Sequence, residues 1–359
     1  MFTRNQFSPL TRSASLAVLM VGMAACTSQI SSKTPLNGAG ASLPAPLYEL
    51  WFSQYEQQNS GIRIDYESVG SGAGIEQFLA QEVDFAATDV PLNADEIAQF
   101  PEERGDVIQV PVVGSAVVLA YNLEGIKALQ LSRDAYCGIA TGEISNWNDP
   151  AIAADNPDID LPNLPITFVH REDSSGTTYM FTNHMNAACD NWSAGIGKTV
   201  DWATAMAAPG NGGVTATIKQ TEGAIGYVGF AHAEKNFLSM ASLENQAGFF
   251  VEPSPNSAEL AIELSETAHD LTATMPDPSQ VDAYPIVGLT YMLLYENYED
   301  AATAEAICNV IKWALTDGRL MADALGYAPL SPEIALQVTE MLDTLEIDQV
   351  ASSQAVASR

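Results

Sequence analysis

Apolar and polar positions in the first part of the chain repeat the order strand, turn, helix. Residues 62–66 alternate between apolar and polar side chains as in a half-buried strand, and residues 75–79 place apolar side chains at helical spacing. Residues 36–55 follow the same order, residues 83–88 predict a third strand, and the order returns at residues 166–188. This alternation predicts an α/β fold whose turns gather at the carboxyl edge of a sheet. The expected inward positions of the first helix are Leu47, Leu50, Trp51 and Tyr55.

Two long apolar stretches predict strands that connect two domains. Residues 107–113 and 115–121 are both strand-like, and the Gly114-Ser115 junction between them is a natural crossing point. Residues 286–294 form another apolar strand, which can cross back. The chain is therefore expected to leave its first domain once and to return to it near its end.

Weaker patterns assign the remaining segments. Glycines predict a loop at residues 210–213, and acidic sequence predicts an irregular, exposed stretch at residues 252–284. Trp147 is expected in a core. The other expected elements are a strand at 223–228, helices at 302–316 and from Ser331 onward, and a frayed tail after about residue 348.

The turn at residues 170–178, His-Arg-Glu-Asp-Ser-Ser-Gly-Thr-Thr, has the composition of an anion site. Backbone N–H groups of residues 175–177 open the following helix, where they lack intrahelical acceptors and carry the positive end of the helix dipole. Arg171 adds a planar fork of donors that Asp173 can hold in place. The alternative is a capped helix beside a surface arginine.

Two other turns and one strand end support the anion interpretation. Ser42 stands just before the first helix, and residues 69–74 form a second turn rich in glycine and serine. This second turn is neither a nucleotide P-loop nor a dinucleotide fingerprint, because no lysine follows and the glycine spacing differs. Asp89 follows the third strand, so its carboxylate is expected at the same sheet edge.

The charge of the chain excludes some partners. With 14 basic and 45 acidic residues the formal net charge is -31, which disfavours nucleic acid and anionic membrane surfaces. An anion site in this chain must therefore bind its ligand despite the repulsion of the net negative charge. Buried donors in direct contact with the anion can do so, because salt screens the distant surface charges more than it screens these contacts.

The first 25 residues have the three parts of an export signal. Arg4 and Arg12 precede an apolar core at residues 16–23, which is too short to span a bilayer. Met23-Ala24-Ala25-Cys26 resembles a bacterial lipobox, so lipidation of Cys26 is expected to tether the mature protein to a membrane outside the cytoplasm. Residues 26–34 are then a tether, and ordinary signal cleavage is the alternative.

An exported protein is expected to pair two of its remaining three cysteines. Their spacing has no metal signature. Cys308 shares a helix face with Ala304, Ile311 and Leu315 and is interpreted as a buried thiol. Cys137 and Cys189 are the candidate disulfide.

Four segments together resemble the phosphate-binding protein of bacterial phosphate-specific ABC transporters: GAGASLPAP at 38–46, VGSGAGIEQFL at 69–79, VDFAATDVPL at 83–92 and HREDSSGTTYMFTNH at 170–184. Further similar segments are EISNWNDPAI at 143–152, GAIGYV at 223–228 and AYPIVGLTYMLL at 283–294. The resemblance implies the two-lobed periplasmic-binding-protein fold, type II-like, in which each lobe is a mixed α/β sheet flanked by helices and two strands form the hinge. Lobe I then comprises residues 35–114 plus 288–359, and lobe II residues 115–287.

The resemblance also implies a set of binding residues. The phosphate contacts that it assigns are Ser42, the N–H of Leu43, Ser71, Asp89, Arg171, Ser175, Gly176 and Thr177. Asp173 would orient Arg171. Leu43 stands where Phe is common, and Ser174 replaces a frequent Gly, which adds a side chain at the cleft edge. The Cys137 and Cys189 pair resembles the DING relatives, although the DINGGG sequence is absent.

The implied function is high-affinity, extracytoplasmic binding of inorganic phosphate by a monomer, without a cofactor or metal, and delivery to an ABC-transporter permease. Asp89 accepts a hydrogen bond only from a ligand that carries a proton, which favours hydrogen phosphate over sulfate. The alternatives are a binding protein for another oxyanion and a surface-attached protein that uses phosphate in adhesion or signalling. A serine hydrolase is disfavoured, because no recognisable partner accompanies His170, His184, His232 or His269.

Overall fold

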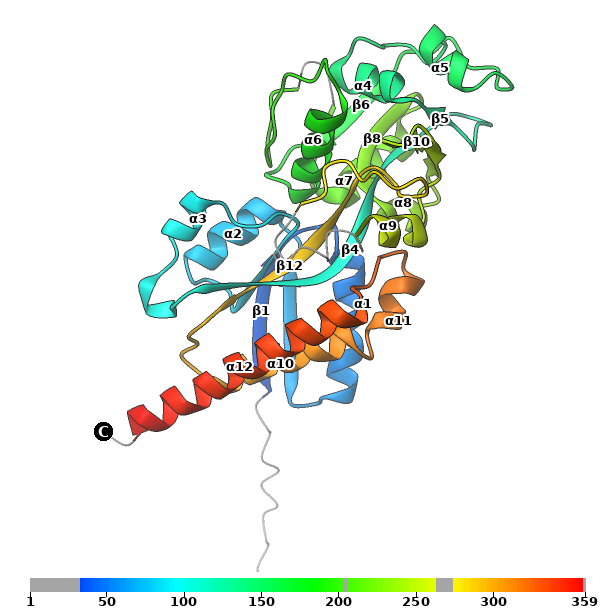
Figure 1. Ribbon diagram of the computed structural model, residues 1–359. Helices are drawn as coiled ribbons and strands as arrows, with labels where there is room; N and C mark the ends of the chain where they lie inside the picture. The colour runs from blue at the N-terminus through cyan, green and yellow to red at the C-terminus, as the bar shows by residue number, and fades with distance from the viewer. Residues whose placement is uncertain (1–32, 203–205, 263–273, 358–359) are drawn as a thin grey trace, which may run out of the picture. The chain divides into compact units, whose positions relative to one another are not determined.

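The computed structural model describes residues 33–202, 206–262 and 274–357, whose strands form one large mixed sheet and one small sheet (Figure 1). The strands are β1 (Thr34–Gly40), β2 (Ile62–Glu67), β3 (Phe85–Thr88), β4 (Val107–Tyr121), β5 (Gln130–Leu131), β6 (Thr167–Arg171), β7 (Met206–Ala208), β8 (Ala224–Gly229), β9 (Ser239–Met240), β10 (Ser242–Glu244), β11 (Phe250–Val251) and β12 (Val287–Tyr295). The large sheet has the order β2-β1-β3-β12-β4-β8-β6-β7, with β9 beside β4, and the small sheet has the order β11-β10-β5. The predicted α/β class is confirmed.

Strand β4 belongs to both halves of the large sheet. Its first part pairs antiparallel with β12, and its last part, from Val117 to Tyr121, pairs antiparallel with β8. The change of partner falls between Ala116 and Val117, two residues after the predicted crossing at Gly114-Ser115, because β12 reaches back to Val287 and pairs there with Ala116. Strands β4 and β12 therefore form the continuous centre of the molecule (Figure 1).

Helices flank the large sheet, and several of them bury an apolar face. The helices are α1 (Ala45–Gln58), α2 (Ser71–Leu79), α3 (Ala94–Ala98), α4 (Arg133–Thr141), α5 (Pro150–Asp155), α6 (Gly176–Ala188), α7 (Gly210–Gln220), α8 (Phe230–Lys235), α9 (Pro255–Ile262), α10 (Ala301–Leu315), α11 (Arg319–Ala324) and α12 (Pro332–Ala357), with a 3₁₀ turn at Glu102–Arg104. Helix α1 buries Leu47, Trp51 and Tyr55 as predicted, while Leu50 is only half-buried. Trp147 is fully buried, as expected.

Three expectations about irregular segments were wrong. Residues 210–213 are not a loop but the first turn of α7, which forms because burial of Val214 and Ile218 against β6 and β8 outweighs the low helix propensity of glycine. The stretch at 252–284 contains α9, whose buried face packs against β4 and β12. The tail after residue 348 continues α12 to Ala357, because no glycine or proline interrupts the sequence there.

Several predictions fall on residues that the structure does not describe. The export signal at residues 1–25, the lipid-modified Cys26, most of the tether at 26–34 and His269 all lie outside the described residues. Among the described helices, none combines the length and the apolar composition needed to cross a membrane.

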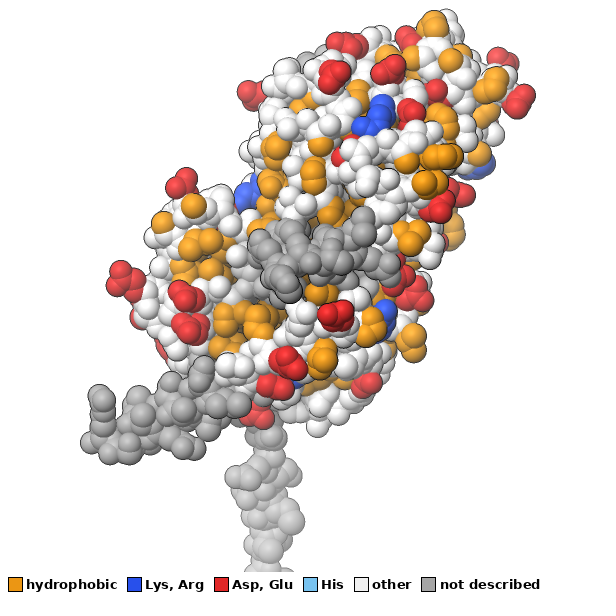
Figure 2. Space-filling view, in the orientation of Figure 1, with side chains coloured by type: hydrophobic (Ala, Val, Ile, Leu, Met, Phe, Trp, Pro, Cys, Tyr) orange, Lys and Arg blue, Asp and Glu red, His pale blue; other side chains and the backbone are white. Residues whose placement is uncertain are grey.

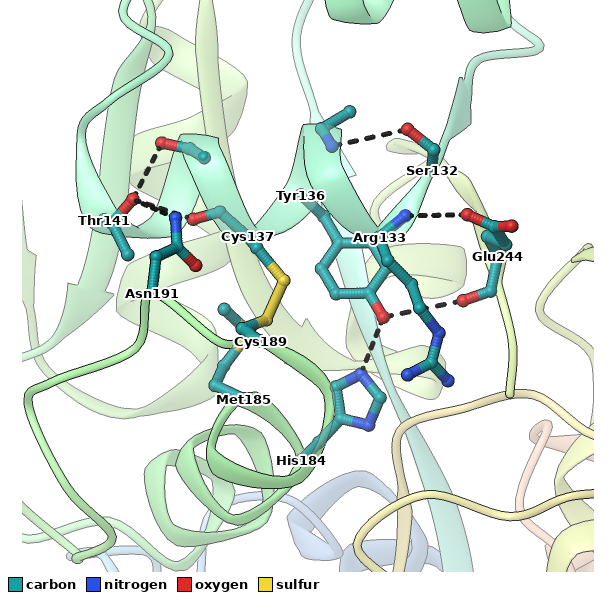
Figure 3. Close-up of a disulfide and its surroundings, with 12 residues drawn as sticks. Ser132, Arg133, Tyr136, Cys137, Thr141, His184, Met185, Cys189, Asn191 and Glu244 are labelled. Carbon is teal, nitrogen blue, oxygen red and sulfur yellow. Dashed lines mark hydrogen bonds between the residues drawn. A yellow bond between two sulfur atoms is a disulfide. The ribbon is translucent and has the colours of Figure 1, made fainter. Parts of the chain in front are cut away.

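The predicted disulfide between Cys137 and Cys189 is present and joins α4 to the residue that follows α6 (Figure 3). Beside it, Asn191 Nδ2 donates to Glu143 and to the hydroxyl of Thr141, and these bonds fasten the same two chain segments. Cys308 is buried in α10 and takes no part in the disulfide, as expected. The disulfide therefore anchors one end of α6, whose other end follows the turn at residues 170–175.

Removal of this disulfide is expected to lower stability without changing the site. The bridge closes a loop of 52 residues, so the Cys137→Ser, Cys189→Ser double variant should lose about 2–4 kcal/mol of unfolding free energy. Urea unfolding with and without reductant measures this loss. The parent chain should become as unstable as the variant when reductant is added, and the variant should not respond to it. An unchanged midpoint in both conditions would contradict the prediction.

Candidate functional site

The structure brings together four polar segments that the sequence places at separate turns. They follow β1, β2, β3 and β6, which are parallel neighbours or lie in the two halves of the same sheet. All eight predicted contact residues are buried: Ser42, Leu43, Ser71, Asp89, Arg171, Ser175, Gly176 and Thr177. The site therefore consists of polar groups withdrawn from water, which is costly unless each finds a partner.

Asp89 supplies a buried carboxylate at the end of β3. Its Oδ1 atom accepts from the hydroxyl of Thr290 at 2.8 Å, and its N–H donates to Ser71 Oγ at 3.2 Å. Burial raises the pKa of Asp89 to about 7, although the Thr290 hydrogen bond and the charge of Arg171 act in the opposite direction. Its second oxygen, Oδ2, accepts no hydrogen bond from another described residue and can serve a ligand.

Arg171 is the buried cation of the site. Its Nε donates to Asp173 Oδ1 at 2.8 Å, its Nη2 pairs with Asp173 Oδ2, and its Nη1 donates to Thr177 Oγ1 at 3.2 Å. Burial alone would raise the pKa of Asp173, but the hydrogen bonds and charge of Arg171 hold that pKa below its usual value. Asp173 Oδ1 also accepts from Gly210 N–H at 2.9 Å. Asp173 thus holds two nitrogen atoms of the guanidinium and is itself held by the backbone of Gly210.

Asn211 is a central residue that the sequence interpretation missed. Its Nδ2 donates to Ser42 Oγ and to Thr177 Oγ1, each at 3.0 Å, and its Oδ1 accepts from Gly229 N–H at 2.8 Å. Its own N–H also donates to Ser42 Oγ at 3.0 Å. The available signal is Pro209 directly before Gly210 and Asn211, because proline is common at a helix start, although the glycines at 210–213 predict a loop.

Four predicted contact residues have hydroxyl groups that accept hydrogen bonds from N–H groups. Ser42 accepts from Asn211, Ser71 from Asp89 and Thr177 from Arg171 and Asn211, while Ser175 Oγ accepts from Thr178 N–H at 3.1 Å. None of these four hydroxyls donates to another described residue. Because each O–H still has a hydrogen to give, the site presents four hydroxyl donors to a ligand.

One predicted donor is already used. The N–H of Ser175 donates to Lys198 O at 2.9 Å, so it is not available to an anion. This part of the prediction was wrong, because a contact with the loop that follows α6 cannot be seen in the local sequence. Gly176 and Thr177 occupy the first turn of α6, where N–H groups have no intrahelical acceptor, and they remain as donors.

Residues 35–114, predicted as part of lobe I, and residues 115–287, predicted as lobe II, contact each other directly around the site. Gly72 N–H donates to Ser174 O at 2.9 Å, and Lys198 forms an ion pair with Glu96. The side chain of Ser174, the departure noted in the sequence, lies against Gly72, where any added Cβ would overlap it. A glycine on lobe I thus makes room for the extra serine side chain on lobe II.

Gly176 packs so closely against lobe I that a larger residue does not fit. A Cβ on Gly176 would lie 2.6 Å from Asp89 Cβ and 2.9 Å from the Asp89 backbone nitrogen. Gly176→Ala is therefore expected to hold the lobes apart and to weaken anion binding at least about 100-fold. Calorimetric titration checks this expectation.

Gly212→Ala is the matched control for this substitution. Gly212 also lies in the first turn of a helix beside the site, but an added Cβ there would meet nothing within 4 Å. The control should bind as the parent does. Equal affinity of both variants would contradict the close contact at Gly176.

The three described histidines contact groups other than the serine hydroxyls of the site. His170 contacts the backbone oxygen of Arg171, His184 lies between Tyr136 OH and Pro276 O, and His232 contacts Ser42 O. Within the described ranges none of these rings reaches a serine hydroxyl of the site, and no group of His, Cys, Asp and Glu could hold a metal ion. The geometry is that of a binding site with a fixed cation, hydroxyl and N–H donors, and one carboxylate.

Comparisons with known proteins show the family to which the chain belongs. Residues 27–317 match the PBP superfamily domain. The phosphate-binding protein PstS of Pasteurella multocida is 36% identical over 335 residues, covering 92% of this chain and 95% of that protein. The PstS of Xylella fastidiosa strain 9a5c is 36% identical over 314 residues, covering 84% and 83%. The chain belongs to the PstS phosphate-binding proteins of the PBP superfamily.

A solved structure extends the family assignment to the fold. The high-affinity periplasmic phosphate-binding protein PfluDING, bound with phosphate, superposes with a TM-score of 0.70 at 25% identity, covering 85% of this chain and 93% of that protein. As a member of this family, the chain has the two-lobed fold of periplasmic binding proteins, and both the family and the fold predicted from the sequence are confirmed. Its relatives are named as binding proteins rather than as enzymes.

Proposed function

We propose that this chain captures inorganic phosphate outside the cytoplasm, between lobes I and II, and delivers it to the permease of an ABC transporter. The observation that carries the proposal is the direction of the hydroxyl hydrogen bonds. Four hydroxyls accept from the protein and keep their hydrogens for a ligand, beside the buried guanidinium of Arg171. A tetrahedral oxyanion that has lost its water shell needs hydrogen-bond donors for all its oxygen atoms. The four hydroxyls and the guanidinium supply such donors.

The carboxylate of Asp89 favours an anion that carries a proton. When ionised it can only accept, so it stabilises a ligand oxygen that bears a hydrogen and repels one that does not. Hydrogen phosphate carries such a hydrogen at neutral pH, whereas sulfate does not. Arsenate shares the geometry and the proton of phosphate and is expected to bind as a competitor.

The remaining parts of the proposal concern delivery. The proposal includes export by the signal at residues 1–25, lipidation of Cys26 and a monomeric state. These properties would keep the protein at the membrane that contains the permease. The acidic surface in Figure 2, with few basic side chains on the face shown, supports exclusion of nucleic acid. The buried donors act at short range and do not depend on the sign of the net charge.

Calorimetric titration of the chain without residues 1–25, stripped of carried-over ligand, tests the proposal. Phosphate and sulfate are added in separate runs at matched ionic strength. One-to-one phosphate binding without a sulfate response is the expected result. Equal binding of both anions would reject the role of Asp89, and no phosphate binding would reject the function. Mass spectrometry of the membrane fraction tests acylation of Cys26.

A further inference from the structure

Three consecutive carbonyl groups in the turn between β1 and α1 are each held by a different side chain. The hydroxyl of Tyr66 donates to Ala41 O, His232 Nε2 contacts Ser42 O, and the hydroxyl of Tyr327 donates to Leu43 O, each at 2.8 Å. The three side chains come from β2, from α8 and from the segment after α11. Three successive carbonyls of one short turn thus accept hydrogen bonds from side chains that are remote in the sequence.

Holding a carbonyl also fixes the direction of an N–H group. In a planar trans peptide, the C=O of one residue and the N–H of the next point in opposite directions. Tyr66 therefore directs the N–H of Ser42, and His232 directs the N–H of Leu43. Neither of these two N–H groups donates to another described residue, while the Ser42 hydroxyl in the same turn reaches Asn211 inside the site.

We propose that Tyr66 and His232 are positioning residues that aim the N–H groups of Ser42 and Leu43 at the bound anion. The inference rests on the phosphate site proposed above and adds two residues that touch no ligand. His232 lies in lobe II but holds a turn of lobe I, so one imidazole sets the donor geometry of the opposite lobe. It does so beside Gly229, which pairs with Val117 where β4 changes partner.

The tautomer of His232 follows from its contact. A carbonyl oxygen can only accept, so Nε2 must carry the hydrogen. Burial lowers the pKa of His232 to about 4, although hydrogen bonds to the backbone act in the opposite direction. The ring is therefore neutral at pH 7 and needs no counter-charge. A glutamine amide can supply the same single donor, whereas a leucine of similar size cannot.

Tyr327 provides a matched control within the same turn. The carbonyl that it holds belongs to the peptide between Leu43 and Pro44, and proline has no N–H. Tyr327→Phe removes a buried hydrogen bond of the same length as the one lost from His232, yet it releases no donor. Stability should fall in both cases, but only loss of His232 should misdirect a ligand contact.

The experiment compares phosphate affinity by calorimetry with urea unfolding for His232→Leu, His232→Gln, Tyr66→Phe and Tyr327→Phe. His232→Leu and Tyr66→Phe should lose about 10- to 100-fold in affinity, the scale of one hydrogen bond to a charged group. His232→Gln should recover most of this loss, and Tyr327→Phe should stay within about twofold of the parent.

The outcomes separate the inference from the function on which it rests. If the parent binds phosphate but His232→Leu and Tyr327→Phe lose affinity equally, or if His232→Gln is as weak as His232→Leu, the positioning role is wrong. A parent chain that does not bind phosphate rejects the proposed function itself. Should His232→Leu not fold, the comparison of Tyr66→Phe with Tyr327→Phe decides, because each removes only one hydroxyl.

Discussion

Sulfate is expected to bind the Asp89→Asn variant far more tightly than it binds the parent chain. The amide oxygen of the asparagine can still accept the hydrogen bond from Thr290. The amide nitrogen takes the place of a carboxylate oxygen that could only accept, and it can donate to an unprotonated oxygen of sulfate. The ratio of phosphate to sulfate affinity should fall by roughly 10²- to 10⁴-fold, within the range available to a site that requires a ligand hydroxyl. Calorimetry at pH 8 with both anions measures this ratio.

The pH dependence of the parent provides an independent check. Because the pKa of Asp89 is about 7, the carboxyl gains a proton as the pH falls through neutrality and can then donate to sulfate. Sulfate affinity of the parent should rise from pH 8 to pH 6, while that of the Asn variant should not change for this reason. Asp65→Asn, at a half-exposed carboxylate, should behave as the parent does. A flat sulfate response in the parent would contradict the assigned role.

The same substitution should change stability with a defined sign. A carboxyl group whose folded pKa lies above its usual value of 3.8 stabilises the fold most at low pH, and this contribution is lost as the pH rises through 7. Without anion, Asp89→Asn should therefore be more stable than the parent at pH 8 by a few kcal/mol, on the order of 4 at most, and should lose this advantage near pH 4. Urea unfolding at both pH values tests the sign.

Loss of Arg171 is expected to remove most phosphate binding. Its side chain is 1% exposed and supplies the buried positive charge of the site, so Arg171→Met should weaken affinity by about 10²- to 10⁴-fold. Arg171→Lys keeps the charge but loses the planar fork, and an intermediate affinity is expected.

The control for Arg171 is Arg63→Met. Arg63 also pairs with an aspartate two residues away, but its side chain is 62% exposed. This control should bind phosphate as the parent does, since an exposed pair contributes little. Because Arg171→Met leaves Asp173 without its cation, circular dichroism must show that the variant is folded. A folded Arg171→Met that binds within tenfold of the parent would rule out the guanidinium as the main anion contact.

The sequence was informative where the contacts are local. The turns after β1, β2, β3 and β6 could be predicted because strand, turn and helix follow one another within about 20 residues, and parallel strands must end at a common edge. Asp173 and Arg171, two residues apart, were likewise paired correctly. The family resemblance then supplied a predicted role for each turn, which periodicity alone could not do.

The residues that were missed act over long distances in the sequence. Thr290 reaches Asp89 across 201 positions, His232 reaches Ser42 across 190, and Asn211 reaches Ser42 across 169. Each is a common residue type without a local motif, so its role depends on packing that periodicity does not encode. Asn211 was also difficult to assign because the glycines around it predict a loop. Helix α7 forms there because its apolar face is buried against the sheet.

The direct contacts between the lobes have a consequence for how occupancy responds to anion concentration. Gly72 N–H to Ser174 O and the Lys198 pair with Glu96 form between protein groups alone, so they favour the joined conformation even when no anion is bound. The measured affinity is the intrinsic affinity scaled by the fraction of molecules already joined. Substitutions at Lys198 or Glu96 therefore shift the half-saturating anion concentration without altering any group that touches the ligand. The concentration at which the site fills can thus evolve separately from the choice between anions.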